Sequence, residues 1–170
     1  MFWKLMGAIL VAAGSGLVGI GARQSLCRRV EVRRQIALGL ELLQGELEMS
    51  MPPAAELLTR VGQRLGGPVG EVLLTAGQDM EAVPGRPPLG ALRISLEELK
   101  CLDSAEGQLL LELGTCLGRY DLTGQVRALA YLRKRTEALI EQAEKQLEQK
   151  ARASVTAAVC GGLALIVLLF

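Results

Sequence analysis

The chain has 170 residues, enough for one domain of ordinary size. Half of the residues are hydrophobic but only 3% are aromatic, and the Leu, Ala and Val that make up the apolar mass favour helices over sheets. The absence of histidine excludes the commonest acid–base and metal-ligand chemistry, and a net charge of +1 gives no general attraction for nucleic acid. This composition favours a scaffold over an enzyme.

Two uncharged runs lie at the ends of the chain, at residues 5–22 and 153–170. As a helix each run would span about 27 Å, close to the roughly 30 Å of a bilayer core. We therefore expect an N-terminal transmembrane anchor over residues 1–22 and a C-terminal transmembrane helix over residues 153–170. A cleaved signal peptide is the alternative for the first run, because Lys4 gives it a short positive start. No clear cleavage site follows, so we expect the run to be retained.

Basic residues flank the inner side of both runs, and the outer flanks offer only Lys4. The inner residues are Arg23, Arg28, Arg29, Arg33 and Arg34 after the first run, and Lys145, Lys150 and Arg152 before the second. The positive-inside rule then places residues 23–152 in the cytoplasm. We expect these arginines to contact lipid headgroups rather than a specific lipid or nucleic acid.

The first half of the middle segment shows helical periodicity and no strand pattern. A helix is predicted to run from the first anchor to about Ser50, because apolar residues repeat at steps of four and three at Ile36, Leu40, Leu43 and Leu47. Pro52-Pro53 should end it and start a second helix, which Gly66-Gly67-Pro68 should end. A third helix is predicted over residues 69–80, followed by a loop at residues 84–90.

The second half predicts three more helices. A short helix covers residues 89–99, and Asp103 or Ser104 can cap the next helix, which carries apolar residues between 109 and 117. The last helix has apolar residues at heptad-like spacing from Leu122 and continues into the second uncharged run. The predicted fold class is all-α, with a small cytoplasmic helical bundle over residues 23–152 between N- and C-terminal transmembrane helices.

No constellation of residues with catalytic chemistry is found in the sequence. The four cysteines form no C-x-x-C pair; they are Cys27, Cys101, Cys116 and Cys160. Cys116 and Cys160 are expected to pack as small apolar residues. For Cys27, a packing role is favoured over palmitoylation. The nearest carboxylate pairs, Glu97-Glu98 and Glu46/Glu48, do not face a common point on a helix. There is no phosphate-binding loop. We therefore expect no catalytic residue, no metal site and no cofactor.

Several short motifs resemble the stage III sporulation protein AB family. They are KLMGAILVAAGSGLVG at residues 4–19, LELLQGELEMSMPPAAELL at residues 40–58, LGTCLGRYDLTGQ at residues 113–125 and GGLALIVLLF at residues 161–170. Each is short, but their order and spacing cover nearly the whole chain. The sequence departs from the family at Met49 and Met51, where members tend to have Tyr or Thr before the proline.

The resemblance implies a role in sporulation that composition alone does not predict. It implies a mother-cell membrane protein that belongs to a channel complex joining mother cell and forespore. The soluble part would be similar to the cytoplasmic domain of type II secretion platform proteins. The expected partners are a secretion-type ATPase of the same operon, other stage III sporulation channel proteins and membrane lipids, with a homo-oligomer possible and no nucleic acid. The alternatives are a signalling or lipid-interacting helical hairpin, and a membrane-face enzyme that uses Glu97 or Asp121.

The most family-like cluster, Gly118, Asp121 and Gln125, supplies the candidate partner-binding residues. Gly118 suits a left-handed turn that closes one helix, and Asp121 can cap the next helix. Gln125 is expected to cap nothing, so that its loss should leave the fold intact. Two roles stay open for the cluster: a helix corner, which we favour, and direct contact with a partner.

Overall fold

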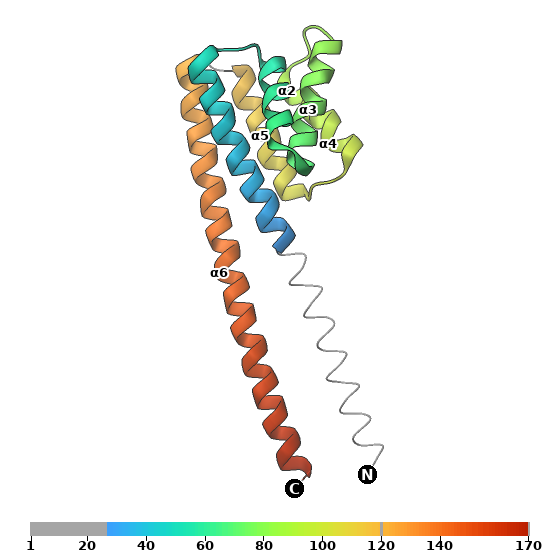
Figure 1. Ribbon diagram of the computed structural model, residues 1–170, viewed down its shortest axis with the longest axis vertical. Coiled ribbons are helices and arrows are strands. Elements are labelled where there is room, and N and C mark those ends of the chain that lie inside the picture. The colour runs from blue at the N-terminus through green and yellow to red at the C-terminus, as the bar shows by residue number, and fades with distance from the viewer. Residues whose placement is uncertain (1–26, 120, 170) are drawn as a thin grey trace. The chain divides into compact units, whose positions relative to one another are not determined.

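The computed structural model describes the backbone of residues 27–119 and 121–169, and side chains up to Gln149 except those at 118, 119, 122 and 147. A helix over residues 27–50 is followed by α2 (Ala54–Leu65), α3 (Gly67–Ala82), α4 (Pro88–Leu99), α5 (Ser104–Arg119) and α6 (Leu122–Leu169). These described ranges contain helices and no strand, which confirms the predicted all-α class (Figure 1).

The chain divides into two compact units. One consists of residues 31–140, and we call it the bundle unit; the other consists of residues 1–30 and 141–170. Across the residues that the structure describes, no helix is both long and apolar enough to cross a bilayer. The run predicted as the anchor over residues 1–22 lies outside the described residues. Of the run at 153–170, only the helical backbone through Leu169 is described. Membrane insertion of both runs stays a prediction.

The core of the bundle unit is aliphatic, as the periodicity predicts. The expected positions on the helix over residues 27–50 are all buried, at Ile36, Leu40, Leu43 and Leu47. They pack in one cluster with apolar residues of every other helix, among them Leu57, Val61, Val69, Leu73, Leu92, Leu110, Leu113 and Leu129. Burying one such side chain stabilises the fold by about 1.5–3 kcal/mol, so this cluster supplies most of the favourable free energy of folding.

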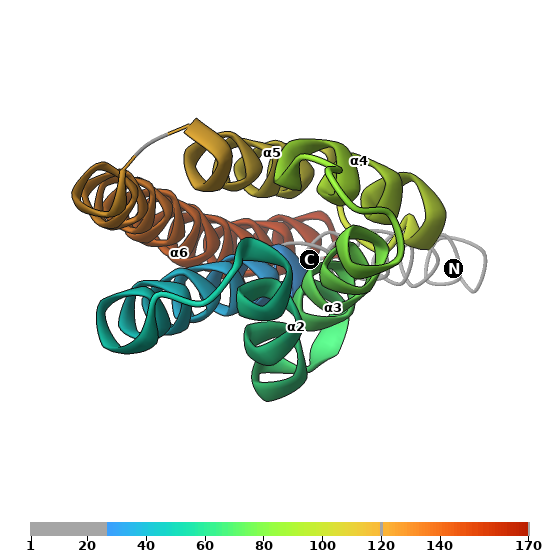
Figure 2. The ribbon, with the colours of Figure 1, turned by 90° about the horizontal axis from the view of Figure 1, so that it is seen from above.

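From α2 to α5, each helix packs on the next one in the sequence. α2 contacts α3, α3 contacts α4, and α4 contacts α5. Figure 2 shows the two pairs, α2 with α3 and α4 with α5, side by side within each pair. The helix over residues 27–50 also lies beside the first part of α6. Glu41 of this helix has its Oε2 atom 3.9 Å from Nη1 of Arg133 in α6.

A single residue connects α2 to α3. Gly66 has φ +61° and is followed directly by Gly67, also at φ +61°, which begins α3. The predicted three-residue break at Gly66-Gly67-Pro68 is therefore too long. Two glycines reverse the chain at once because they adopt left-handed backbone angles without a steric penalty, and Pro68 in the first turn of α3 gives up only an amide that has no helical partner.

Glycines also let α2 and α3 approach backbone to backbone. A Cβ atom on Gly62 of α2 would lie 2.8 Å from the carbonyl oxygen of Gly70 in α3. A Cβ atom on Gly77 of α3 would overlap Thr59 Oγ1 and would lie 2.8 Å from the carbonyl oxygen of Ala55. No side chain larger than hydrogen fits at Gly62 or Gly77 unless the helices move apart.

The loop between α3 and α4 is shorter than predicted. α3 ends at Ala82 and α4 begins at Pro88, so the last part of the predicted loop at residues 84–90 is helical. Pro88 occupies the first position of α4, where its fixed φ suits the helix and its missing N–H costs no hydrogen bond. Arg86 pairs with Asp79 and fastens the loop to the last part of α3.

Candidate functional site

The predicted cluster at residues 118–125 forms the connection between α5 and α6. Asp121 caps α6 as predicted: the Gly124 N–H donates to Asp121 Oδ1 at 3.2 Å, and the Gln125 N–H donates to the Asp121 carbonyl oxygen at 2.9 Å. Gly118 is not in a left-handed turn, because its backbone is helical within the last turn of α5. The predicted left-handed closing turn at Gly118 is therefore wrong.

Gln125 also differs from its prediction. Its Nε2 donates a hydrogen bond of 3.0 Å to the carbonyl oxygen of Leu117, which belongs to the last turn of α5. The last carbonyls of a helix lack partners within it, so this side chain caps α5 from α6. Gln125 joins α6 to α5 and Asp121 caps α6, which supports the corner role. Direct partner contact by Gly118, Asp121 and Gln125 stays a prediction.

A buried ion pair that the sequence analysis did not predict holds three helices together. Arg33 Nε lies 2.8 Å from Glu106 Oε1, and Arg33 Nη1 donates to the carbonyl oxygen of Leu139 at 3.3 Å. Glu106 in the first turn of α5 is only 1% exposed, and its Oε2 has no hydrogen-bond partner among the described residues. Arg33, expected to contact lipid headgroups, instead pairs inside the bundle unit. Nothing in the local sequence pairs Arg33 with Glu106, because 73 residues separate them.

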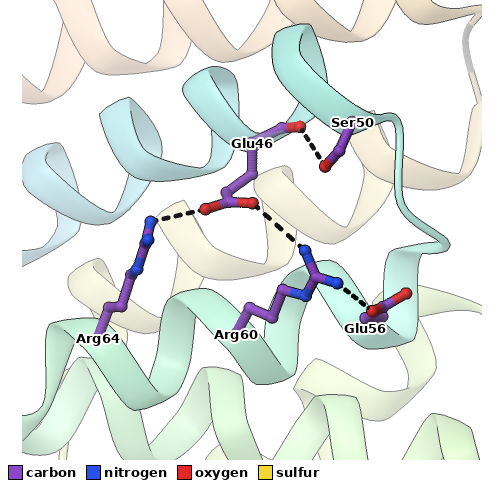
Figure 3. A network of polar contacts seen from close by, with 5 residues as sticks. All are labelled: Glu46, Ser50, Glu56, Arg60 and Arg64. Atoms are coloured by element: carbon purple, nitrogen blue, oxygen red, sulfur yellow. Dashed lines mark hydrogen bonds and ion pairs between the residues drawn. The ribbon is translucent and has the colours of Figure 1, made fainter.

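A second polar network joins α2 to the helix over residues 27–50 (Figure 3). Glu46 accepts from Arg64 at 2.6 Å and lies 3.7 Å from Arg60, which also pairs with Glu56. With Gln63, the side chains of Glu46, Arg60 and Arg64 line an open depression of about 330 Å³. Both guanidinium groups are already paired, Arg64 with Glu46 and Arg60 with Glu56, so neither is free for an anion. The geometry of the depression suits helix packing better than ligand binding.

The remaining candidate groups for chemistry lie apart from one another. Glu97 and Glu98 are both exposed at the end of α4, and Glu48 accepts a hydrogen bond from Gln44. Burial, with a smaller contribution from Glu112, raises the pKa of the Cys116 thiol and makes it a weak nucleophile at neutral pH. Cys27, expected to pack, is exposed. Among the described residues no three His, Cys, Asp or Glu side chains could hold a metal ion together.

Comparison with known proteins defines the family. A solved structure described as "Stage III sporulation protein AB (SpoIIIAB)" has a TM-score of 0.62 and 20% sequence identity to this chain, and the match covers 71% of this chain and 97% of that one. At this identity the likeness shows a shared fold. Curated proteins give no significant match. The profile of the stage III sporulation protein AB family matches residues 4–170, so the chain belongs to that family of sporulation proteins.

Proposed function

We propose that the chain is a non-enzymatic platform in the mother-cell membrane, within the channel complex that joins mother cell and forespore. It recruits the secretion-type ATPase of its operon from the cytoplasm and binds other stage III channel proteins. The observation that carries this proposal is α6, a continuous helix of 48 residues that begins in the bundle unit and extends into the uncharged run at residues 153–170.

The direction of the helices in the bundle unit supports anchoring at both ends. Arg33 contacts the Leu139 carbonyl, and Glu41 lies near Arg133, so the helix over residues 27–50 and α6 run antiparallel. Residues 31 and 140 consequently lie at the same end of the unit. The C-terminal end of the helix over residues 27–50 and the N-terminal end of α6 lie at the other end (Figure 1). Two membrane segments would leave from one end and expose the other end to cytoplasmic partners.

The test is co-purification of the full chain with the ATPase of the same operon from sporulating cells. The tagged chain should sediment with membranes, and the ATPase should remain on it after washing in mild detergent. A matched control is a tagged membrane protein of similar size that is expressed in the same cells. If the chain sediments with membranes and the ATPase stays behind, recruitment is wrong and a lipid-interacting or signalling hairpin becomes the better interpretation.

A further inference from the structure

One face of α6 in the bundle unit carries Arg127, Tyr131 and Lys134, which we call the basic face. The three residues are spaced by four and then three positions. Because each residue turns the helix by about 100°, their side chains lie within roughly 60° of one another around the helix. All three are exposed. The opposite side of the helix packs on the core through the buried residues Leu129, Leu132 and Thr136.

Tyr131 is unusual because the core of the described residues contains no aromatic side chain. Tyr131 is the one aromatic side chain that the described residues contain, and it is 71% exposed. A tyrosine buries a large area at low entropic cost, and Tyr and Arg are enriched at the centres of protein–protein interfaces. A single ring held on the surface between two cations is therefore suited to a partner rather than to the fold.

The charges on the basic face are not neutralised by the molecule itself. Within the described part of the chain, Arg127 and Lys134 make no ion pair or hydrogen bond. The acidic residues beside the face are already paired: Glu137 lies 3.5 Å from Arg133, and Glu112 lies 2.7 Å from Arg135. The face consequently presents an unbalanced positive potential around Tyr131, which attracts carboxylates.

We propose that the basic face docks an acidic helix of a partner protein. Arg127 and Lys134 lie about 10 Å apart along the axis, so two carboxylates seven residues apart on the partner helix would reach both cations. An apolar residue between those carboxylates would pack on the Tyr131 ring. A second copy of this chain meeting face to face would oppose like charges, which disfavours self-association there. The inference rests on the proposed platform function only in requiring a protein partner.

The test is photo-crosslinking of the full chain in sporulating cells, with p-benzoylphenylalanine in place of Tyr131. We expect a cross-link to a helix of another protein that carries two Asp or Glu residues about seven apart. Arg127→Glu with Lys134→Glu should reduce its yield at least five-fold, whereas Arg93→Glu, at an exposed arginine of α4, should not. Replacing the mapped carboxylates by Lys should restore the yield with the doubly reversed chain. The milder Arg127→Gln with Lys134→Gln should give an intermediate loss.

Other outcomes overturn the inference. They are a cross-link to lipid or to this chain itself, a yield no higher than with the photo-probe at the exposed Gln78 of α3, and a protein cross-link that the charge reversal leaves unchanged. Failure of ATPase recruitment is distinguishable from these outcomes. A charge-sensitive cross-link to an acidic helix of another protein would support the basic face even if the ATPase does not co-purify.

Discussion

Arg33 contacts two helices through one guanidinium group, since it pairs with Glu106 of α5 and donates to the Leu139 carbonyl of α6. Removing one partner of a buried pair leaves an uncompensated charge, whereas removing both can be nearly neutral. The pair therefore helps to determine which helices pack together, and it adds little to the total free energy of unfolding.

A double-mutant cycle measures the coupling free energy between Arg33 and Glu106. Arg33→Met and Glu106→Met should each lower the free energy of unfolding by about 3–5 kcal/mol, and the double variant should lose less than either single variant. The measurement is urea unfolding of the full chain in detergent, monitored by circular dichroism. Lys145→Met is the control, because it removes an exposed i,i+4 pair with Glu141 and should change little. Additive losses in the double variant would contradict the interpretation of Arg33 and Glu106 as a coupled pair.

Gln125 gives a second prediction for a single residue. Gln125→Ala leaves the Leu117 carbonyl without its side-chain donor, so the free energy of unfolding should fall by about 0.5–1.5 kcal/mol. Gln108→Ala, at an exposed position on α5, is the matched control and should be nearly neutral. If the two variants unfold at the same urea concentration, the hydrogen bond from Gln125 to Leu117 makes no net contribution to the free energy of unfolding.

At the scale of whole helices, the α2–α3 pair depends on residues without side chains. Gly62, Gly70 and Gly77 let the two backbones touch, and Gly66 with Gly67 reverses the chain between the helices. The pair is therefore a tightly packed hairpin in which an added methyl group at the contact is destabilising.

Gly77→Ala should lower the free energy of unfolding by about 1–3 kcal/mol, because its new methyl group would overlap Thr59 and Ala55. Gly45→Ala is the matched control: it lies within the helix over residues 27–50 and has nothing within 4 Å of a new Cβ atom. That change should raise stability by about 0.5–1 kcal/mol, since alanine is the better helix former. Equal effects of the two substitutions would show that the close approach at Gly77 relaxes easily.

Periodicity predicts the helices well because each buries one face, and Ile36, Leu40, Leu43 and Leu47 are all in the core. It fails where a residue's role is set by a distant segment. Nothing local distinguishes Arg33 from its neighbour Arg34, and Glu106 lies 73 residues away in sequence. The same holds for Gln125, whose acceptor belongs to the preceding helix. Asp121 was predictable because N-capping is local.

For the molecule as a whole, the proposed topology gives a direct test. If both ends are anchored and the bundle unit is cytoplasmic, a cysteine introduced at Gln78 on the exposed side of α3 should resist a membrane-impermeant maleimide in intact cells and react after lysis. Native Cys101 is a poorer reporter because it is half-buried, with its Sγ 3.7 Å from the Pro68 carbonyl oxygen. Rapid labelling at position 78 from outside would reverse the orientation and remove the basis for cytoplasmic ATPase recruitment.

The distance in sequence between Arg33 and Leu139 also determines the order of events during synthesis. These two residues are 106 positions apart. A ribosome adding roughly 5–20 residues per second needs about 5–20 s to bridge that gap. During this interval α3, α4 and α5 can each pack on the helix made just before, because those contacts are local. The helix over residues 27–50 must wait for α6, so its face toward α6 stays open until the last part of the bundle leaves the ribosome.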